Sequence, residues 1–160
     1  MNKIDLIYKK KLNKKIKLKN KFYLKLIKSH SFDKEILRIR NNNKNLNFTL
    51  TKNKIFLADH RRWFQNFLKK KNFMFIILYL DKIIGYIRLE KNRKNLIISI
   101  IIKKKFRKNN LGSISLEFIE KKFEGFNLVA YVSKDNLLSI NFFKKNKFKK
   151  SSKKKKLIII

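Results

Sequence analysis

Apolar and polar positions along the chain fall into blocks that predict alternating strands and helices. Short, nearly continuous apolar runs have the length of buried strands, and they occupy residues 22–27, 73–79, 83–89, 97–102 and 128–132. Apolar residues with helical spacing predict helices over residues 32–40, 54–70 and 114–123 and after residue 136. Residues 16–18 and 157–160 add a short strand near each end. Strands that alternate with helices indicate an α/β (α+β) fold.

Local signals mark where some of these elements begin and end. Ser31 is a candidate N-cap for the first helix, because Asp33 and Glu35 follow in its first turn. A tight turn at residues 81–82 separates two apolar runs and predicts a hairpin. No flexible linker divides the chain. We therefore expect one domain over residues 1–160, with a lysine-rich N-terminal extension over residues 1–20.

The composition is strongly basic, with 44 lysines and arginines against 10 acids and a net charge of +34. Such a balance is typical of proteins that bind nucleic acid or another anionic surface. However, asparagine, isoleucine and phenylalanine are also used heavily, while proline is missing and glycine occurs three times. The abundant residues have A/T-rich codons and the rare ones do not. We interpret the charge as the background of an A/T-rich genome, and we expect no specific nucleic acid partner.

The missing residue types also limit the chemistry. Without cysteine, the chain has no disulfide, no thiolate-bound metal and no catalytic thiol, and we expect no metal. Its longest apolar runs are too short to cross a bilayer as a helix. The N-terminus lacks the apolar core of a signal peptide, so we expect a cytoplasmic protein without a membrane span.

The clearest chemical signal is the basic loop that follows the apolar run 97–102. It reads Lys-Lys-Lys-Phe-Arg-Lys-Asn-Asn-Leu-Gly-Ser over residues 103–113 and leads into a predicted helix. Unpaired backbone N–H groups and the positive end of the helix dipole would point at an anion there, which suits a pyrophosphate. Gly112 would let the backbone approach that anion closely.

This loop resembles the pyrophosphate loop of the GNAT family of N-acetyltransferases. The family pattern is Arg/Gln-x-x-Gly-x-Gly/Ala, and Arg107, Asn110 and Gly112 stand at its fixed positions. Asn110 replaces a glycine. Because asparagine tolerates a positive φ angle, we expect the loop to form nevertheless.

A second motif of the same family follows about 25 residues later, after a predicted strand. The family reads Asn-x-x-Ala/Ser-x-x-Leu-Tyr-x-x-x-Gly-Phe, and this chain matches it at Asn136, Ser139, Phe142 and Phe148. Two positions differ, because Phe143 stands at the tyrosine and Lys147 at the glycine. The resemblance implies the GNAT fold, with a mixed central sheet of about six to seven strands flanked by about four helices.

The resemblance also implies acetyl-CoA as cosubstrate. In the family, a bulge in the fourth strand frees backbone N–H groups that hold the pantetheine arm, and Ile100 and Ile102 match those positions. The implied coenzyme-binding residues are Ile100, Ile101, Ile102, Arg107, Lys108, Asn109, Asn110, Leu111, Gly112, Ser113, Asn136, Ser139 and Phe143.

Acyl transfer to an amine needs a group that accepts the amine proton and a group that protonates the leaving thiolate. Relatives commonly use a carboxylate on the fourth strand and the tyrosine of the second motif. Here Ile97 and Phe143 take those places, and neither can exchange a proton. The candidate catalytic positions are therefore Glu90, Tyr131 and Phe143, and a slow or inactive enzyme stays an alternative.

The N-terminal half resembles the aminosugar N-acetyltransferases of the pseudaminic acid pathway. Those enzymes have an Arg-Asn pair at the end of the first helix and a His-x-x-Trp-Phe motif on the second. The implied substrate-binding residues are Arg40, Asn41, His60, Trp63, Tyr86 and Arg88. Plain structural roles compete with these assignments, because His60 and Trp63 lie on the apolar face of a predicted helix.

The resemblance thus implies acetyl transfer to the amino group of a nucleotide-linked aminodeoxysugar. Another GNAT activity, on a protein N-terminus or a small amine, remains open. A degenerate member that binds CoA or nucleic acid without turnover is the third alternative. A homodimer is compatible with the sequence.

Overall fold

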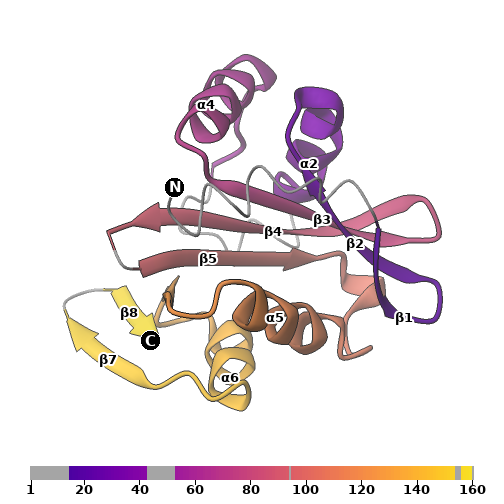
Figure 1. The fold of residues 1–160 in the computed structure, drawn as a ribbon. Helices are drawn as coiled ribbons and strands as arrows, with labels where there is room; N and C mark the ends of the chain where they lie inside the picture. The colour runs from indigo at the N-terminus through magenta and orange to yellow at the C-terminus, as the bar shows by residue number, and fades with distance from the viewer. Residues whose placement is uncertain (1–14, 43–52, 94, 154–155, 160) are drawn as a thin grey trace.

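The structure is a computed structural model that describes residues 15–42, 53–93, 95–153 and 156–159. Its centre is an eight-stranded mixed sheet with the order β1-β2-β3-β4-β5-β6-β8-β7 (Figure 1). The strands are β1 (Ile16–Lys19), β2 (Phe22–Ile27), β3 (Phe73–Tyr79), β4 (Lys82–Asn92), β5 (Asn95–Ile102), β6 (Asn127–Val132), β7 (Lys150–Lys153) and β8 (Lys156–Ile159).

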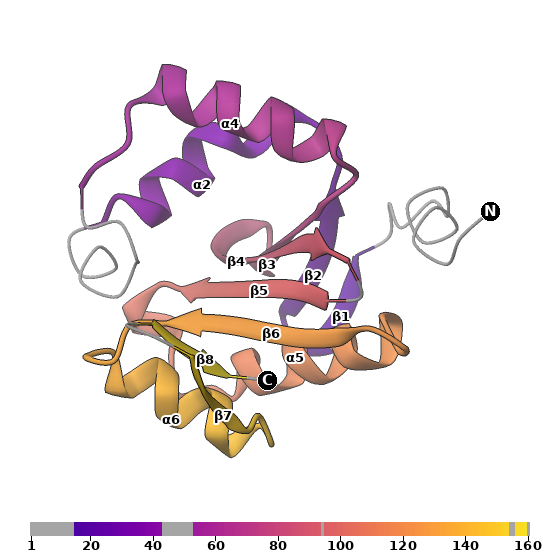
Figure 2. The ribbon, with the colours of Figure 1, turned by 90° about the vertical axis from the view of Figure 1, so that its left-hand side faces the viewer.

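Helices cover both faces of this sheet, as Figure 2 shows. α2 (Asp33–Arg40) and α4 (Leu57–Lys69) lie on one face, and α5 (Leu111–Lys122) and α6 (Leu137–Lys145) on the other. Two short 3-10 turns, η1 (His30–Phe32) and η2 (Lys104–Phe106), precede α2 and α5. Six of the seven residues of β3 are buried, which explains why its sequence is continuously apolar and does not alternate.

The two faces of the sheet belong to two apolar clusters. Phe64 and Phe67 of α4 pack with β3 residues such as Ile76 on one side. Leu116 and Phe123 of α5 pack with core residues of the other face. Strands β1 to β5 are all paired antiparallel, whereas β5 and β6 are parallel. The crossover between these two strands is α5, as a parallel pair requires.

The predicted α/β (α+β) architecture is confirmed, including the strand near residue 16, the hairpin at residues 81–82 and the four helices. The sheet has one strand more than expected, because the chain end forms the hairpin of β7 and β8 where the sequence indicated a single strand. The expected extension over residues 1–20 lies largely outside the described residues, and its last part is β1. None of the described helices combines the length and the apolar character that a membrane span requires.

The predicted start of the first helix was wrong by one residue. α2 begins at Asp33 with Phe32 at its N-cap, and no side chain caps it. The Ser31 hydroxyl is 2.9 Å from that of Ser29 instead. The preceding 3-10 turn explains the difference, because Ser31 lies inside η1 and not at the N-cap position of α2.

Gly85 fixes the spacing of the central strands. It pairs with Ile77 of β3 and with Ile102 of β5, directly beside a register shift between β3 and β4. A Cβ atom on Gly85 would lie 2.4 Å from the carbonyl oxygen of Ile101, which is a backbone atom that cannot rotate away. The close approach of β4 and β5 at this point therefore requires glycine.

We predict that Gly85→Ala destabilises the protein by about 1–3 kcal/mol, because the added methyl group must push two central strands apart. For a chain of this size the melting temperature should fall by about 2–4 °C per kcal/mol. The matched control is Lys82→Ala, at an exposed position of the same strand. Equal melting temperatures for the two variants would show that β4 and β5 do not approach this closely.

Candidate active site

β5 and β6 separate after a short stretch of pairing. Residues 95–97 of β5 pair with residues 127–129 of β6, and the register ends there. Residues 130–132 of β6 pair instead with β8 on their other side. Ile100, Ile101 and Ile102 are consequently half-buried, although they belong to a strand in the middle of a large sheet. The structure thus opens a gap between two neighbouring strands.

The backbone of β5 directs polar groups into this gap. The N–H of Lys103 donates to the Ile84 carbonyl of β4 at 2.8 Å, so groups at every second residue before it also face β4. The N–H and C=O groups of Ile100 and Ile102 therefore point toward β6. Among the described residues, no strand pairs with them at that edge. Two N–H donors thus stand open in the gap, at the positions that the family resemblance implies.

The expected cause of these open donors was wrong. The sequence suggested a bulge in β5, but β4 and β5 keep an unbroken register along their whole shared length. The register shift lies one strand further away, between β3 and β4. The donors are open because β6 leaves β5 and joins β8, which is a property of the sheet and not of the strand itself.

The basic loop connects the gap to the start of α5. Lys108 and Asn110 adopt positive φ angles of 65° and 58°, so the backbone curls before the helix begins. The prediction that Asn110 would tolerate such a conformation is confirmed. In the described part of the chain, no group accepts from the N–H groups of residues 111–113. The loop therefore presents N–H donors and a helix N-terminus together, an arrangement that suits a diphosphate.

Arg107 and Gly112 hold this loop in place. Arg107 Nε donates to the Ile102 carbonyl at 2.9 Å, which ties the loop to the end of β5. A Cβ atom on Gly112 would lie 2.7 Å from the ring of Phe142 on α6. Gly112 thus allows α6 to pack on the first turn of α5. The role visible here is helix packing, and the close approach of Gly112 to the anion stays a prediction.

The second motif forms the ends of α6. The Asn136 side chain accepts from the Ser139 N–H at 3.0 Å and so caps the helix. At the other end, the N–H of Phe148 donates to the Phe143 carbonyl at 3.1 Å and the rings of these two residues are 5.1 Å apart. This is a Schellman motif with its hydrophobic contact, and Lys147 occupies the left-handed position with a φ of 67°. That conformation explains why the family has glycine at the position of Lys147.

The three predicted catalytic positions lie on two faces of the sheet. Phe143 is 4% exposed and belongs to the apolar cluster on the α5 and α6 side. Tyr131 is 37% exposed, and it points to the opposite face because its neighbours Ala130 and Val132 belong to that same cluster. Glu90 lies two residues from Arg88 on β4, and its carboxylate is 3.0 Å from Arg88 Nε. Glu90 and Tyr131 thus share the face that carries α2 and α4.

Several predicted acceptor-binding residues meet on this face. The guanidinium of Arg88 lies 5.4 Å from the ring centre of Trp63 on α4. Arg88 also donates to the Ser99 hydroxyl of β5 at 3.2 Å. The His60 ring stands 5.4 Å from that of Trp63. Sequence reasoning missed Ser99, although it is the one polar residue in the apolar run 97–102.

Burial and charge set the protonation states around Arg40. Burial lowers the pKa of Arg40, Tyr86 opposes this effect, and repulsion from Arg88 adds to it. Burial also raises the pKa of the Tyr86 hydroxyl above its ordinary value. His60 is 3% exposed, and burial lowers its pKa more than the carboxylate of Asp33 raises it. At neutral pH we therefore expect a neutral His60 near Arg40.

Asn41 and Arg40 have a structural role that the sequence did not reveal. The Asn41 side chain donates to the Ile55 carbonyl at 2.8 Å and accepts from the Ile55 N–H at 3.1 Å. Arg40 donates to the side chain of Asn41 and to the carbonyl of Asn53. The pair therefore holds the segment that leads into α4. The polar atoms of the Asn41 side chain are used by these hydrogen bonds, whereas the positive charge of Arg40 still interacts with Tyr86 and Arg88.

These residues fit a coenzyme that carries an acyl thioester. The gap supplies open N–H donors at Ile100 and Ile102, and the loop supplies donors for a diphosphate. Among the described residues, histidine, aspartate and glutamate form no cluster that could hold a metal ion.

Comparison with known proteins agrees with this geometry. Residues 39–148 match the sequence profile of the acetyltransferase (GNAT) family. The sequence has no match among proteins of curated function.

Solved structures of low sequence identity share the fold. A domain from Methanocaldococcus jannaschii is 19% identical, with a TM-score of 0.76 over 88% of this chain and 97% of that one. The ribosomal-protein-alanine N-acetyltransferase of Brucella melitensis is 16% identical, with a TM-score of 0.68 over 85% and 96%. YncA of Salmonella typhimurium, solved with its cofactor acetyl-CoA, is 12% identical, with a TM-score of 0.70 over 88% and 92%. The family match extends over most of the chain and its fold is the expected one, so the chain belongs to the GNAT family of acetyl-CoA-dependent N-acetyltransferases.

Proposed function

We propose that the acceptor amine belongs to an anionic molecule, and specifically to a nucleotide-linked aminodeoxysugar of the kind used in the pseudaminic acid pathway. The observation that carries this proposal is the position of Arg88 beside Trp63, with Arg40 near enough to be repelled by it, on the face that carries α2 and α4. The motifs around Arg40 and His60 resemble those of the aminosugar enzymes.

The charges on this face favour an anion. Arg40 and Arg88 are close enough to repel each other, and in the described part of the chain Glu90 forms its ion pair with Arg88. A phosphate or carboxylate would relieve the repulsion, and the planar fork of an arginine binds such groups in a bidentate manner. The half-buried Trp63 ring adds an apolar surface on which a base or a sugar ring can stack.

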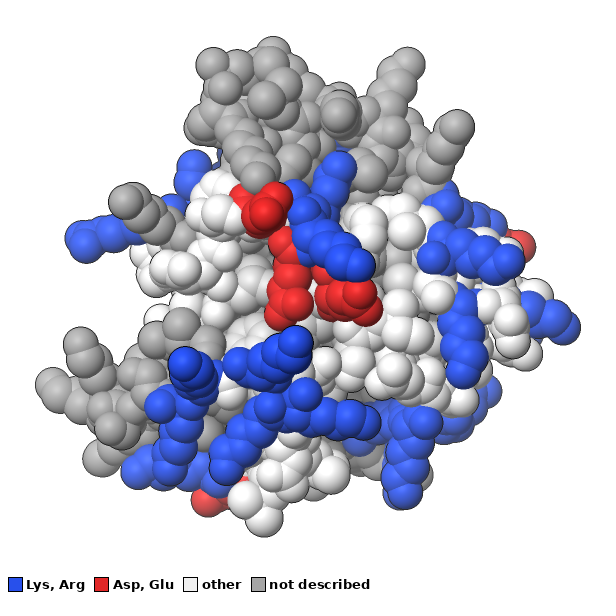
Figure 3. Space-filling model, turned by 60° about the horizontal axis from the view of Figure 1, so that its bottom comes forward, with Lys and Arg blue, Asp and Glu red and all other residues white. Residues whose placement is uncertain are grey.

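The net charge of the chain would favour such ligands over longer distances. Figure 3 shows the face at the bottom of Figure 1, where lysine and arginine side chains are spread around one central group of acidic side chains. A positive field of this kind raises the rate at which anions reach a site and weakens with salt. It does not select one anion over another, so the specificity in this proposal rests on Arg88, Arg40 and Trp63.

For the chemistry, acetyl-CoA supplies an activated acetyl thioester. The N–H groups of Ile100 and Ile102 would stabilise the charge that develops on the acyl oxygen. Glu90 is the carboxylate on the acceptor face, and we assign it the uptake of the amine proton, directly or through a water. Tyr131 is 37% exposed on the same face, and we assign its hydroxyl the protonation of the leaving thiolate.

A protein N-terminus is the second candidate acceptor. It is favoured by the structural likeness to the Brucella melitensis enzyme, which is named for a ribosomal protein alanine. A peptide acceptor would need room for an extended chain beside Trp63 and Glu90. Arg88 would then have no phosphate to bind, so the two candidates differ in what removing its charge should do.

The first prediction of this proposal concerns the coenzyme loop. CoA should raise the melting temperature, with a stabilisation of about 2.7 kcal/mol at a hundredfold excess over its Kd. Asn110→Gly keeps the positive φ and should keep this effect. Asn110→Val is strained there by about 1–2 kcal/mol and should lose most of it. If CoA stabilises neither the parent protein nor Asn110→Gly, the loop is not its site.

The second prediction concerns the acceptor. Arg88→Gln should raise the KM for a nucleotide-linked aminosugar about tenfold or more, since hydrogen bonds to charged groups contribute about 1.5–3 kcal/mol. It should change the KM for a neutral amine little. Arg62→Gln, at an exposed position of α4, is the matched control. The assay follows CoA release with UDP- and dTDP-linked aminosugars, free aminosugars and peptides. Acetylation of peptides alone would refute the sugar assignment.

The third prediction concerns the thiolate proton. Tyr131→Phe should lower kcat by up to about 10²-fold while leaving the KM for acetyl-CoA unchanged, because the hydroxyl acts as charge develops. Adding Phe143→Tyr to that variant should restore part of the rate if residue 143 faces the gap. An unchanged kcat in Tyr131→Phe would show that the thiolate leaves without this acid.

A further inference from the structure

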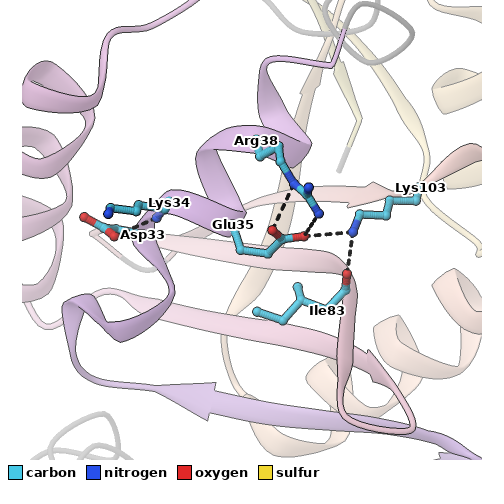
Figure 4. A network of polar contacts seen from close by, with 6 residues as sticks. All are labelled: Asp33, Lys34, Glu35, Arg38, Ile83 and Lys103. Atoms are coloured by element: carbon cyan, nitrogen blue, oxygen red, sulfur yellow. Dashed lines mark hydrogen bonds and ion pairs between the residues drawn. The ribbon is translucent and has the colours of Figure 1, made fainter.

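One group of contacts links the acceptor-side helices to the coenzyme loop. Figure 4 shows Lys103, the first residue after β5, reaching across to Glu35 on α2. Lys103 Nζ is 2.8 Å from Glu35 Oε1 and donates to the Ile83 carbonyl at 2.7 Å. Arg38 holds the same carboxylate from α2, with Nε 3.0 Å from Glu35 Oε2. One carboxylate therefore joins two cations that belong to different parts of the fold.

Lys103 is also the base of the coenzyme loop. Its N–H donates to the Ile84 carbonyl at 2.8 Å, and its own carbonyl accepts from the Phe106 N–H at 2.9 Å. The first turn of the loop, η2, is therefore built directly on Lys103. Arg107 closes the same turn by bonding back to Ile102. A shift of Lys103 would consequently move the donors that follow at residues 108–113.

α2, at the other end of the link, is tied to the acceptor side. Asp33 at its start is 2.8 Å from Arg61 of α4, and Arg40 and Asn41 at its end hold the segment that enters α4. Burial works to raise the pKa of Glu35, but its bonds to Lys103 and Arg38 lower it overall, so the carboxylate is charged at neutral pH. The side chains of Glu35 and Lys103 are 28% and 29% exposed, which leaves their attraction less screened than at the open surface.

We propose that the Glu35–Lys103 ion pair is a positioning contact that sets the coenzyme loop from α2 and couples coenzyme binding to acceptor binding. Neither residue touches a reacting atom. An acceptor that fixes the positions of α2 and α4 also fixes Lys103 through Glu35. In the other direction, a coenzyme that orders the loop fixes the position of α2 through the same ion pair. Such coupling is reciprocal between two binding sites. The inference rests on the proposed role of the loop in holding the diphosphate.

The test measures CoA affinity directly, by calorimetry, with and without a saturating non-reacting analogue of the acceptor. Lys103→Met should weaken CoA binding by about two- to thirtyfold, the usual range for a contact that transmits coupling. Glu35→Gln should weaken it similarly, and the double variant should be no weaker than either single variant. In the parent protein the acceptor analogue should change the affinity for CoA, and this change should disappear in both single variants and in the double variant. Lys103→Arg keeps the charge and should retain both the CoA affinity and the effect of the acceptor analogue.

The control is Lys121→Met, which breaks a Lys–Glu pair of 2.7 Å on the exposed side of α5 without touching the loop. Melting curves separate loss of fold from loss of coupling. If CoA does not bind the parent protein, the proposed coenzyme site fails. If CoA binds the parent and Lys103→Met equally well, only the ion-pair inference fails. Tighter CoA binding by Glu35→Gln would also overturn it, because Glu35 would then be withholding Lys103 from the phosphates.

Discussion

The separation of β5 from β6 is the constraint on which the functional part of this structure depends. Backbone N–H groups inside a sheet normally find partners, and leaving them open costs free energy. Here β6 leaves β5 after three paired positions and joins β8, so Ile100 and Ile102 keep open donors in the middle of the protein. α5 and its loop follow directly from the open end of β5. Open backbone donors of β5, of the basic loop and of the start of α5 thus follow one another in the same part of the fold.

The two faces of the sheet also carry different groups of residues. The face covered by α5 and α6 holds an apolar cluster that fixes the loop, with Gly112 against Phe142. The face covered by α2 and α4 gathers Arg40, Arg88 and Glu90 with Trp63. Because the gap passes between β5 and β6, a ligand held from one face can meet a group from the other. The Glu35–Lys103 pair bridges the two halves at the end of β5.

Much of the fold was predictable because local signals agree with it. The apolar run of β3, the hairpin turn after it and the helical spacing of α4 each identify their element. The motifs also predicted Asn110 at a positive φ, a conformation for which asparagine is suited. The positive φ of Lys147 and Lys108 was not predictable from residue type, since lysine has no preference for it. The N-cap of α2 was missed because the 3-10 turn before it has no distinct signal.

The sequence by itself determined the element order, the basic loop before α5 and the family resemblance, because these depend on short-range periodicity and on motifs that are contiguous in the chain. Only the tertiary structure decided that the open donors come from strand separation, that Asn41 serves the backbone of Ile55, and that Glu35 reaches Lys103. Those contacts join residues that lie far apart in the sequence. Their partners are chosen by the register of the sheet and the packing of helices, which no local pattern encodes.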